Sequence, residues 1–398
     1  MNGATDKCEA LVIGGGPAGL AAAERLAARG YSVLVAEAMP SVGRKFLMAG
    51  KSGLNLTKTE EPEAFLSRFA DGSDTLHAAM RDFGPKAVIA WAEGLGQPVF
   101  TGSTGRVFPV AMKASPLLRA WLARLAAMGV TVRTRMRWTG WEADAWRFET
   151  PDGVRLIRAE AVVLALGGAS WRRLGSDGAW ADGLGLAVAP FKPSNVGLRV
   201  DWSAHMAPRF GQPVKAVRLI AGAVESRGEW VIAEGGIEGG GIYEVSMAVR
   251  DGAPLFLDLL PDLALDEVMA RLARPRGKAS LSNHVRKVLG LSPVLRALLM
   301  EWGRPLPEGT ALAQRIKALP VPVIGTMPMD RAISTGGGLA WDARDGLRLK
   351  DRPGVFAAGE MLDWEAPTGG YLLTACLATG RAAGDAASDW IEAARPGV

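Results

Sequence analysis

A glycine-rich turn close to the start of the chain restricts the possible folds more than any other feature. It stands in "VIGGGPAGLAAAERLAARGYSVLVAE" and has the spacing Gly14-x-Gly16-x-x-Gly19. An apolar strand precedes the turn, an alanine-rich helix follows it and ends at Gly30, and a second apolar strand ends at Glu37. This order is typical of the β-α-β unit that binds a dinucleotide, so the sequence predicts an α/β fold with a parallel sheet.

Each position of this turn has a physical role in binding a pyrophosphate. Gly14 permits a tight turn, Gly16 lets the backbone approach the ligand, and Gly19 lets the helix pack closely on the strand. The pyrophosphate then meets free N–H groups and the positive end of the helix dipole. Glu37, 18 residues after Gly19, is placed to accept hydrogen bonds from ribose hydroxyls. The fingerprint serves NAD and FAD alike and does not choose between them.

The later part of the sequence favours FAD through a resemblance. In "GVFAAGEMLDWEAPTGGYLLTACLATGRAAG" an apolar strand ends in Gly359-Glu360, and Gly369-Gly370 leads into a helix over 371–394. This resembles the two-dinucleotide-binding-domain flavoproteins, in which such a strand meets the ribityl chain and the helix points at the flavin. A helix N-terminus there suits the negative charge of a reduced flavin. The earlier run "VVLALGG" is similar to a strand that returns past FAD in that family.

A more specific resemblance covers nearly the whole chain. The segments "GRK…SGLNLT", "GRVFP", "EGGIEGGGIYEVS" and "GVFAAGEMLDWEAPTGGY" resemble the HI0933-like flavoproteins, which include aminoacetone-oxidase-like and bile-acid-reductase-like proteins. The resemblance implies a Rossmann-like, glutathione-reductase-like FAD-binding domain interrupted by an inserted β-barrel-like plus helical domain. It also implies FAD bound without a covalent link.

The pattern of elements along the chain agrees with such an insertion. Residues 1–193 and 321–398 are expected to form the FAD-binding domain, and 194–320 the inserted domain. Short apolar segments make 194–260 a β-rich module, and apolar residues at helical spacing make 262–304 helical.

The resemblance carries a set of cofactor contacts onto this sequence. In chain order they are Gly14, Gly16, Pro17, Ala18, Gly19, Glu37, Ala38, Arg44, Lys45, Ser52, Asn55, Thr57, Trp138, Ala165, Gly167, Gly359, Glu360, Asp363, Gly369, Gly370 and Tyr371. One segment departs from the family. Many relatives have Gly-Gly-Gly-Arg-Cys-Asn where this chain has "KSGLN", so the Arg and Cys are absent and the chain forms a distinct branch.

Four residues are candidates for catalysis. Lys51 and Asn55 belong to the polar loop expected near the flavin, and a lysine there could bind an anionic substrate or assist electron transfer to oxygen. Arg106, in "GRVFP", could pair with a substrate carboxylate or with the cofactor, or form a structural ion pair. Tyr243 could present the inserted domain to the flavin, or pack locally. The ending Gly50-Lys51-Ser52 imitates a P-loop, but the glycine that a P-loop needs five residues before Gly50 is missing.

Composition excludes several other classes of site. The two cysteines do not form a C-x-x-C pair, which excludes a disulfide framework and a vicinal dithiol centre, and the three histidines have no ligand spacing, so no metal site is expected. The start of the sequence is unlike a signal peptide, and the chain has no apolar run long enough to span a membrane. We therefore expect a cytoplasmic protein with no membrane partner. Its oligomeric state stays open.

These observations predict an FAD-dependent oxidoreductase that transfers a hydride between the flavin and a small molecule. Only one Rossmann fingerprint occurs, so either oxygen accepts the electrons or NAD(P)H binds transiently as the donor. One alternative is a flavin-binding protein with a structural or redox-sensing role. Another is a flavin-dependent RNA-modifying enzyme, suggested by the net charge of +5. No nucleic-acid-binding motif supports it, and the basic residues are treated as scattered on a solvated surface.

Overall fold

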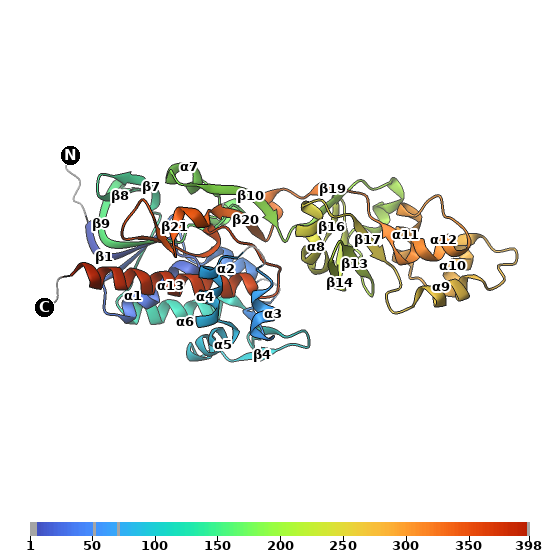
Figure 1. The fold of residues 1–398 in the computed structure, drawn as a ribbon, viewed down its shortest axis with the longest axis horizontal. Coiled ribbons are helices and arrows are strands. Elements are labelled where there is room, and N and C mark those ends of the chain that lie inside the picture. Colours follow the sequence, from blue (N-terminus) through green and yellow to red (C-terminus); the bar gives the residue numbers. More distant parts are fainter. Residues whose placement is uncertain (1–5, 51–52, 70–71, 396–398) are drawn as a thin grey trace. The chain divides into compact units, whose positions relative to one another are not determined.

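The expected β-α-β unit forms the centre of a nine-stranded sheet (Figure 1). β1 (Asp6–Ile13) pairs in parallel with β2 (Val33–Glu37) on one side and with β9 (Gly153–Leu164) on the other. α1 (Pro17–Ala28) connects β1 to β2. The second half of β1 is apolar and fully buried, as expected for a central parallel strand that is covered on both faces. The computed structural model describes residues 6–50, 53–69 and 72–395.

The sheet combines strands from both ends of the sequence. Its main path has the order β21-β22-β23-β9-β1-β2-β6, while β8 pairs with β9 and β7 with β8. The further strands are β6 (Thr131–Thr134), β7 (Arg137–Glu142), β8 (Ala145–Thr150), β21 (Arg344–Asp345), β22 (Arg348–Leu349) and β23 (Val355–Ala357). β23 lies parallel to β9, with Phe356 opposite Val163. The segment after the insertion therefore completes the sheet that the first residues begin.

The last helix, α13 (Tyr371–Ala394), packs along α1 (Figure 1). A β-carbon added to Gly380 would lie 2.2 Å from the carbonyl oxygen of Ala18, and one added to Gly384 would lie 2.6 Å from that of Ala22. Glycines one turn apart on α13 thus face alanines one turn apart on α1, which allows the two backbones to approach closely.

Smaller elements complete this part of the chain. They are α2 (Arg44–Ala49), β3 (Thr57–Lys58), α3 (Pro62–Leu66), α4 (Asp74–Asp82), α5 (Pro85–Gly94), β4 (Val99–Thr101), β5 (Arg106–Pro109), α6 (Ala114–Ala127), α7 (Trp180–Leu184), β10 (Val188–Ser194) and β20 (Ser334–Leu339). β3, β5 and β4 form a three-stranded sheet, and β10 pairs with β20. None of the helices in the described part of the chain is both long enough and apolar enough to cross a lipid bilayer.

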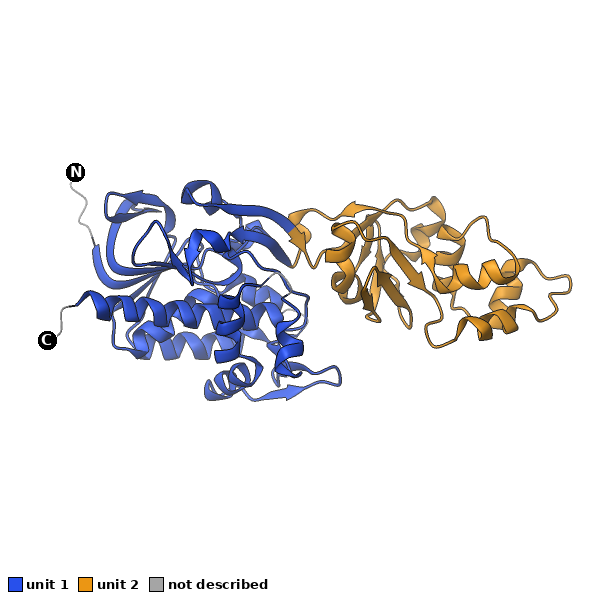
Figure 2. Ribbon diagram, viewed as in Figure 1, with its two compact units in different colours: residues 1–192, 334–398 blue, residues 193–333 orange. Residues whose placement is uncertain are grey.

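The chain divides into two units, each with its own hydrophobic core (Figure 2). Unit 1 is residues 1–192 and 334–398, and unit 2 is residues 193–333. The strands of unit 2 form a five-stranded sheet, β12-β15-β16-β11-β19, and a four-stranded sheet, β14-β13-β17-β18. Their bounds are β11 (Leu198–Val200), β12 (Pro213–Val214), β13 (Arg218–Ala221), β14 (Val224–Ser226), β15 (Trp230–Ala233), β16 (Gly236–Glu238), β17 (Leu255–Asp258), β18 (Leu319–Pro320) and β19 (Val323–Thr326). The helices are α8 (Gly240–Arg250), α9 (Leu265–Leu272), α10 (Leu281–Leu289), α11 (Pro293–Trp302) and α12 (Gly309–Lys317).

Three details of unit 2 differ from the sequence-based expectation. Its second boundary follows residue 333 rather than 320, because β19 pairs antiparallel with β11 and so belongs to the sheet of unit 2. The segment "GGIYEVS" forms the first part of α8 rather than a strand, since Ile242 and Val245 share its buried face. The expected helical stretch also continues beyond 304 into α12, which sequence reasoning did not predict.

Candidate functional site: a dinucleotide pocket in unit 1

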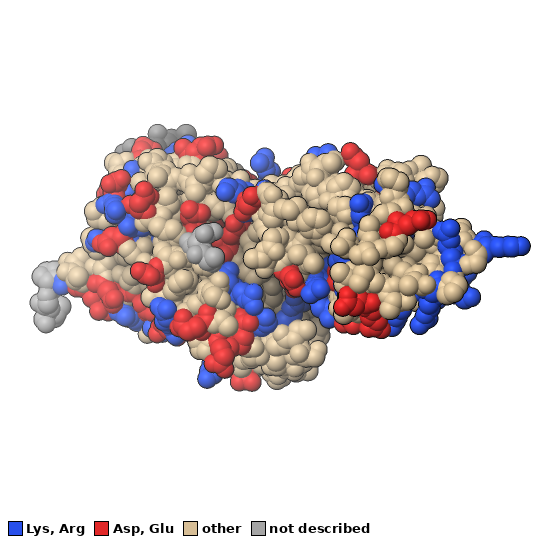
Figure 3. All heavy atoms as spheres, turned by 45° about the vertical axis from the view of Figure 1, so that its right-hand side comes forward, with Lys and Arg blue, Asp and Glu red and all other residues tan. Residues whose placement is uncertain are grey.

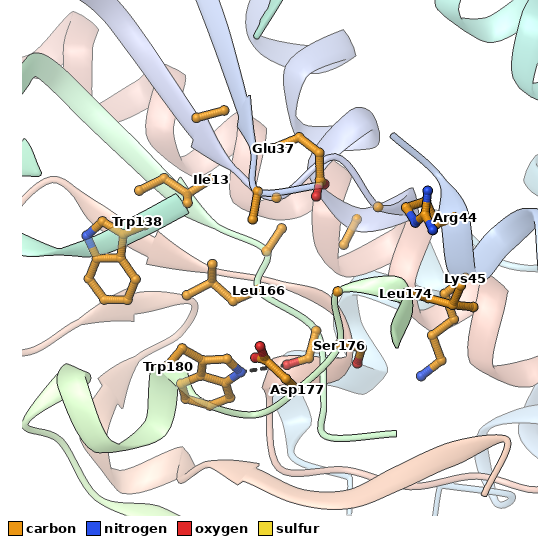
Figure 4. A pocket seen from close by; sticks show the side chains of 18 of the residues that line it. Ile13, Glu37, Arg44, Lys45, Trp138, Leu166, Leu174, Ser176, Asp177 and Trp180 are labelled. Atoms are coloured by element: carbon orange, nitrogen blue, oxygen red, sulfur yellow. Dashed lines mark hydrogen bonds between the residues drawn. The ribbon is translucent and has the colours of Figure 1, made fainter. Parts of the chain in front are cut away.

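The turn after β1 opens onto a cavity of about 320 Å³ in unit 1 (Figure 4). The cavity lies at the carboxyl ends of β1, β2 and β9, beside the start of α1. In Figure 4, Trp138 is at the left of this cavity and Lys45 at the right, with Glu37 above and Trp180 below. An open α/β sheet binds ligands in such a crevice.

The three fingerprint glycines have different surroundings. A β-carbon on Gly14, where φ is +109°, would lie 2.2 Å from the carbonyl oxygen of Ala165. One on Gly19 would lie 1.9 Å from the carbonyl oxygen of Gly14. One on Gly16 would meet no atom within 4 Å, and Gly16 lines the cavity. The absence of a side chain at Gly14 and Gly19 thus allows close backbone contacts, with Ala165 and within the turn itself. At Gly16 it leaves free space for a ligand.

Glu37 is held firmly at the end of β2. Its carboxylate accepts hydrogen bonds from the backbone N–H of Gly15 (2.8 Å) and of Met39 (2.7 Å). Burial raises the pKa of this carboxyl above its ordinary value, against the opposing effect of the two N–H donors. Each carboxylate oxygen has a second lone pair, so the side chain can still accept hydrogen bonds from a ligand.

The other end of the cavity holds an ion pair. Lys45 Nζ lies 2.5 Å from Glu360 Oε2 and donates to Ser170 Oγ at 2.8 Å. The backbone N–H of Thr335 donates to Glu360 Oε1 at 3.1 Å. The Glu360 side chain is 11% exposed, so its charge depends on these partners. Arg44 also lines this end of the cavity.

Sequence reasoning missed the loop that covers the cavity opposite Glu37. Ser176 Oγ donates to the carbonyl oxygen of Gly168 at 3.0 Å, and Trp180 Nε1 donates to that of Gly167 at 2.8 Å. These bonds hold Asp177 beside the cavity, where it pairs with Arg137 at 3.4 Å. The available signal was the glycine-bounded "GSDG", which follows β9 closely and has the composition of a tight turn. The lining residues that sequence reasoning missed include Met136, Arg137, Leu174, Gly175, Ser176, Asp177, Trp180 and Cys376.

The structure brings twelve of the expected cofactor contacts to this one cavity. They are Gly14, Gly16, Pro17, Ala18, Glu37, Ala38, Arg44, Lys45, Trp138, Ala165, Gly167 and Glu360. Two more lie just behind it. Gly19 packs on Gly14, and a β-carbon on Gly359 would lie 2.6 Å from Ala18 Cβ. Asp363 is on the loop after Gly359, with its carbonyl oxygen bonded to Trp341 Nε1.

A second group of expected residues gathers at the start of α13. A β-carbon on Gly370 would lie 2.4 Å from Thr57 Cα, and one on Gly369 would lie 3.9 Å from Arg106 Nε. Leu56 N–H bonds to Val107 O at 2.9 Å, so the neighbouring Asn55 belongs to the segment that runs beside β5. Asn55 Oδ1 is buried without a hydrogen-bond partner among the described residues.

Tyr371 does not line the cavity. Its ring lies 4.8 Å from that of Phe65, and its hydroxyl donates to Glu60 Oε1 at 2.5 Å. Burial and the hydrogen bond to Glu60 raise the pKa of this phenol.

The structure does not bring the remaining candidates to this cavity. Lys51 and Ser52 lie outside the described residues. Tyr243 is on α8 in unit 2, where burial raises its pKa. Burial also raises the pKa of Cys376 to about 12, which keeps this cavity-lining thiol protonated at neutral pH. Within 6–50, 53–69 and 72–395, no three His, Cys, Asp or Glu side chains are grouped so that they could hold a metal ion.

The residues present fit the adenosine diphosphate part of FAD. The cavity combines a helix N-terminus, the cations Arg44 and Lys45, and the carboxylate of Glu37 at the expected ribose position. Arg44 Nε and Trp138 Nε1 are buried donors that find no hydrogen-bond acceptor among the described residues. A polar ligand would provide such acceptors, since buried donors normally have partners.

Comparison with known proteins agrees with this arrangement. The chain is 26% identical to a 3-dehydro-bile acid delta(4,6)-reductase of Clostridium scindens, over 95% of this chain and 98% of that protein. It is 24% identical to the ribosomal RNA dihydrouridine synthase of Escherichia coli, over 92% and 94%. In fold it resembles the 3-ketosteroid-delta4-(5alpha)-dehydrogenase of Rhodococcus jostii, with a TM-score of 0.52 and 18% identity, over 96% of this chain and 97% of that one.

A family comparison covers almost the whole sequence. Residues 8–386 match the HI0933-like protein Rossmann domain. The match includes the fingerprint turn, all of unit 2 and most of α13, and so spans every element that lines the cavity. The chain therefore belongs to the HI0933-like family of Rossmann-fold flavoproteins.

Proposed function

We propose that this protein is an FAD-dependent oxidoreductase that reduces a carbon–carbon double bond conjugated to a carbonyl group. The observation that carries the cofactor assignment is the unit 1 cavity, where a helix N-terminus, two cations and a ribose-binding carboxylate meet. FAD is retained there without a covalent bond.

Each end of the cavity has a distinct task in holding the cofactor. The N-terminus of α1 and the side chains of Arg44 and Lys45 bind the pyrophosphate, and Glu37 accepts from the adenosine ribose. Glu360, fixed by Lys45 and Thr335, accepts from the ribityl hydroxyls. The N-terminus of α13 stabilises negative charge at the flavin end. When bound, FAD supplies a two-electron carrier that can accept and deliver a hydride.

The reaction class follows from what the curated relatives share. One is named for the reduction of double bonds in a 3-oxo steroid, and the other for the conversion of uridine to dihydrouridine. In both compounds the double bond is conjugated to a carbonyl. Reduction then adds a hydride to the β-carbon and a proton to the α-carbon. Asn55 and Arg106, near the start of α13, are candidates to bind the carbonyl oxygen.

An anaerobic experiment tests this proposal. The purified protein is mixed in a stopped-flow spectrometer with NADH or NADPH, and then with a 3-oxo-Δ4 steroid, uridine or a uridine-containing RNA. We expect the visible flavin band to bleach with a nicotinamide donor and to recover with one of the unsaturated acceptors. A colourless protein that takes up no FAD on reconstitution would overturn the proposal. Recovery with oxygen alone would favour an oxidase.

The second candidate substrate is a uridine within RNA rather than a free small molecule. The dihydrouridine synthase aligns with nearly the full length of this chain, and the chain carries a net charge of +5. Recovery of the flavin band with RNA, but not with steroid or free uridine, would select this candidate. A flavin that no donor reduces would instead support a structural or redox-sensing role.

Replacing Glu37 by Gln should weaken FAD binding by about tenfold, because the amide loses the charge that accepts from ribose and turns its NH2 toward one of the two backbone donors. The raised pKa of Glu37 adds a pH dependence. As the pH falls, the carboxylate is protonated earlier than an exposed glutamate, so the native protein should release FAD on mild acidification and the variant should show a flatter profile.

Flavin fluorescence on titration with apoprotein measures both effects. Glu63→Gln, on the exposed side of α3, is the matched control, since its side chain is 83% exposed. Unchanged FAD affinity in Glu37→Gln would contradict the proposal that Glu37 binds the ribose.

A further inference from the structure

Unit 2 contains a stretch in which all formal charges have the same sign. Residues 268–300 include seven Lys or Arg and no Asp or Glu. The whole chain has a net charge of only +5, so the rest of the protein is net negative. Most Lys and Arg lie elsewhere in the chain, but there they are outnumbered by Asp and Glu, so the excess of positive charge is concentrated in this stretch of unit 2. A single-sign cluster of this kind creates a local positive potential.

The fold turns these cations outward. α9 and α10 bury Val268, Val285 and Leu289 in the core of unit 2, so their polar faces remain outside. Figure 3 shows blue side chains gathered at the right-hand end, the end at which Figure 1 places α9 and α10. We name the exposed residues Arg274, Arg276, Lys278, Arg286 and Lys287 the basic end of unit 2.

Most of these charges are not neutralised within the protein. Arg276 lies 3.7 Å from Glu308, on an exposed side chain. Arg274, Lys278, Arg286 and Lys287 form no ion pair with any described residue. Arg286 and Lys287 lie in the last turn of α10, and Arg274 follows the C-cap of α9, so all three are also favoured by a helix dipole, whereas Lys278 lies further along the loop between the helices.

A polyanion with repeated phosphates is the partner that this charge pattern fits. Arginine predominates, and its planar guanidinium binds phosphate oxygens in pairs and stacks on bases. A membrane surface fits poorly, because no exposed large apolar side chain of the described residues falls within 265–304 to enter the lipid. We propose that the basic end of unit 2 binds the phosphate backbone of an RNA strand. The choice of RNA rests on the uridine-in-RNA candidate above, whereas the phosphate contacts rest on the charges alone.

The test is fluorescence anisotropy of a labelled single-stranded RNA with the full-length, FAD-loaded protein. The test variant combines Arg274→Gln, Lys278→Gln, Arg286→Gln and Lys287→Gln. The matched control combines Arg119→Gln, Arg135→Gln, Arg199→Gln and Lys350→Gln, which are exposed, form no ion pair with described residues and remove the same charge. Flavin absorbance and circular dichroism establish that both variants are folded.

The expected results are quantitative. The dissociation constant of the test variant should rise at least tenfold, about 1.4 kcal/mol, at moderate salt. The slope of log affinity against log salt should fall by about 0.7 for each phosphate that the variant no longer neutralises. The control should bind RNA as the native protein does.

Three outcomes would overturn the proposal. They are absence of RNA binding by the native protein at low salt, equal weakening in both variants, and binding to vesicles of anionic lipid with no binding to RNA. Equal affinity for DNA of the same sequence would support the phosphate contacts and contradict the assignment of RNA as the partner. Reduction of the flavin by NAD(P)H is measured in the same preparations, so failure of the proposed reaction is seen separately from failure of RNA binding.

Discussion

Replacing Gly14 by Ala is expected to abolish FAD binding and to lower the free energy of unfolding by about 3–5 kcal/mol. The new β-carbon would lie 2.2 Å from the carbonyl oxygen of Ala165, on a residue whose φ is +109°. Relief of this clash requires the turn to move away from the exit of β9, and Gly14 and Ala165 both line the cavity. The loss of stability is measured by urea unfolding of the apoprotein, and FAD binding by flavin absorbance after reconstitution.

Gly16→Ala should separate the loss of FAD binding from the loss of stability. Gly16 has an extended backbone, with φ −83° and ψ −178°, and a β-carbon there meets no protein atom within 4 Å. Apoprotein stability should change by about 1 kcal/mol or less, while FAD affinity falls at least tenfold because the methyl group occupies the space of the pyrophosphate. Gly30→Ala is the control for backbone strain, since Gly30 has φ +87° in open space. Full FAD affinity in Gly16→Ala would contradict the assigned pyrophosphate position.

The second large effect is expected at the ion pair between Lys45 and Glu360. Lys45→Met should lower the free energy of unfolding by about 3 kcal/mol, because it leaves a carboxylate that is 11% exposed with one remaining hydrogen bond, from Thr335 N–H. Adding Glu360→Gln to this variant should restore part of the stability, since the buried charge is removed as well. FAD affinity should fall in the single and in the double variant, because both lose the cation proposed at the pyrophosphate.

Lys317→Met provides the matched control in unit 2. Lys317 Nζ lies 2.8 Å from Asp258, a fully buried carboxylate that Arg218 also contacts at 3.0 Å. This variant should lose stability by a similar mechanism and keep its FAD affinity, as measured by flavin titration. If Lys317→Met weakened FAD binding as much as Lys45→Met, general destabilisation would explain both, and a direct role of Lys45 would be ruled out.

Much of unit 1 could be predicted because the relevant signals are local. The turn between β1 and α1 specifies its own geometry through glycines a few residues apart, and the acid that follows is reached within the same β-α-β unit. The late turn Gly369-Gly370 likewise leads directly into α13, which begins at Tyr371 as expected. The family resemblance assigned Trp138 and Glu360, which are distant in the sequence, to the cofactor site, and both line the cavity.

The sequence-based predictions were wrong or incomplete where tertiary contacts decide the structure. β19 is four residues long, and only its pairing with β11 places it in unit 2. The segment "GGIYEVS" is rich in residues that favour strands, but α8 forms because its apolar residues follow helical spacing and Gly241 fits against Gly228. The loop around Asp177 reaches the cavity through hydrogen bonds of Ser176 and Trp180 to the backbone after β9, and the turn signal in "GSDG" does not say which partners those side chains have.

The close packing of α13 on α1 has a consequence for the order in which the protein is made. Synthesis produces α1 first and α13 last, with all of unit 2 between them. Unit 2 is continuous, so it can fold while the ribosome is still translating, whereas unit 1 waits for β23, Glu360 and α13. Until then the alanine face of α1 that α13 covers has no partner helix. A ribosome-bound chain that stops before α13 therefore has a folded insertion and no finished place for a dinucleotide.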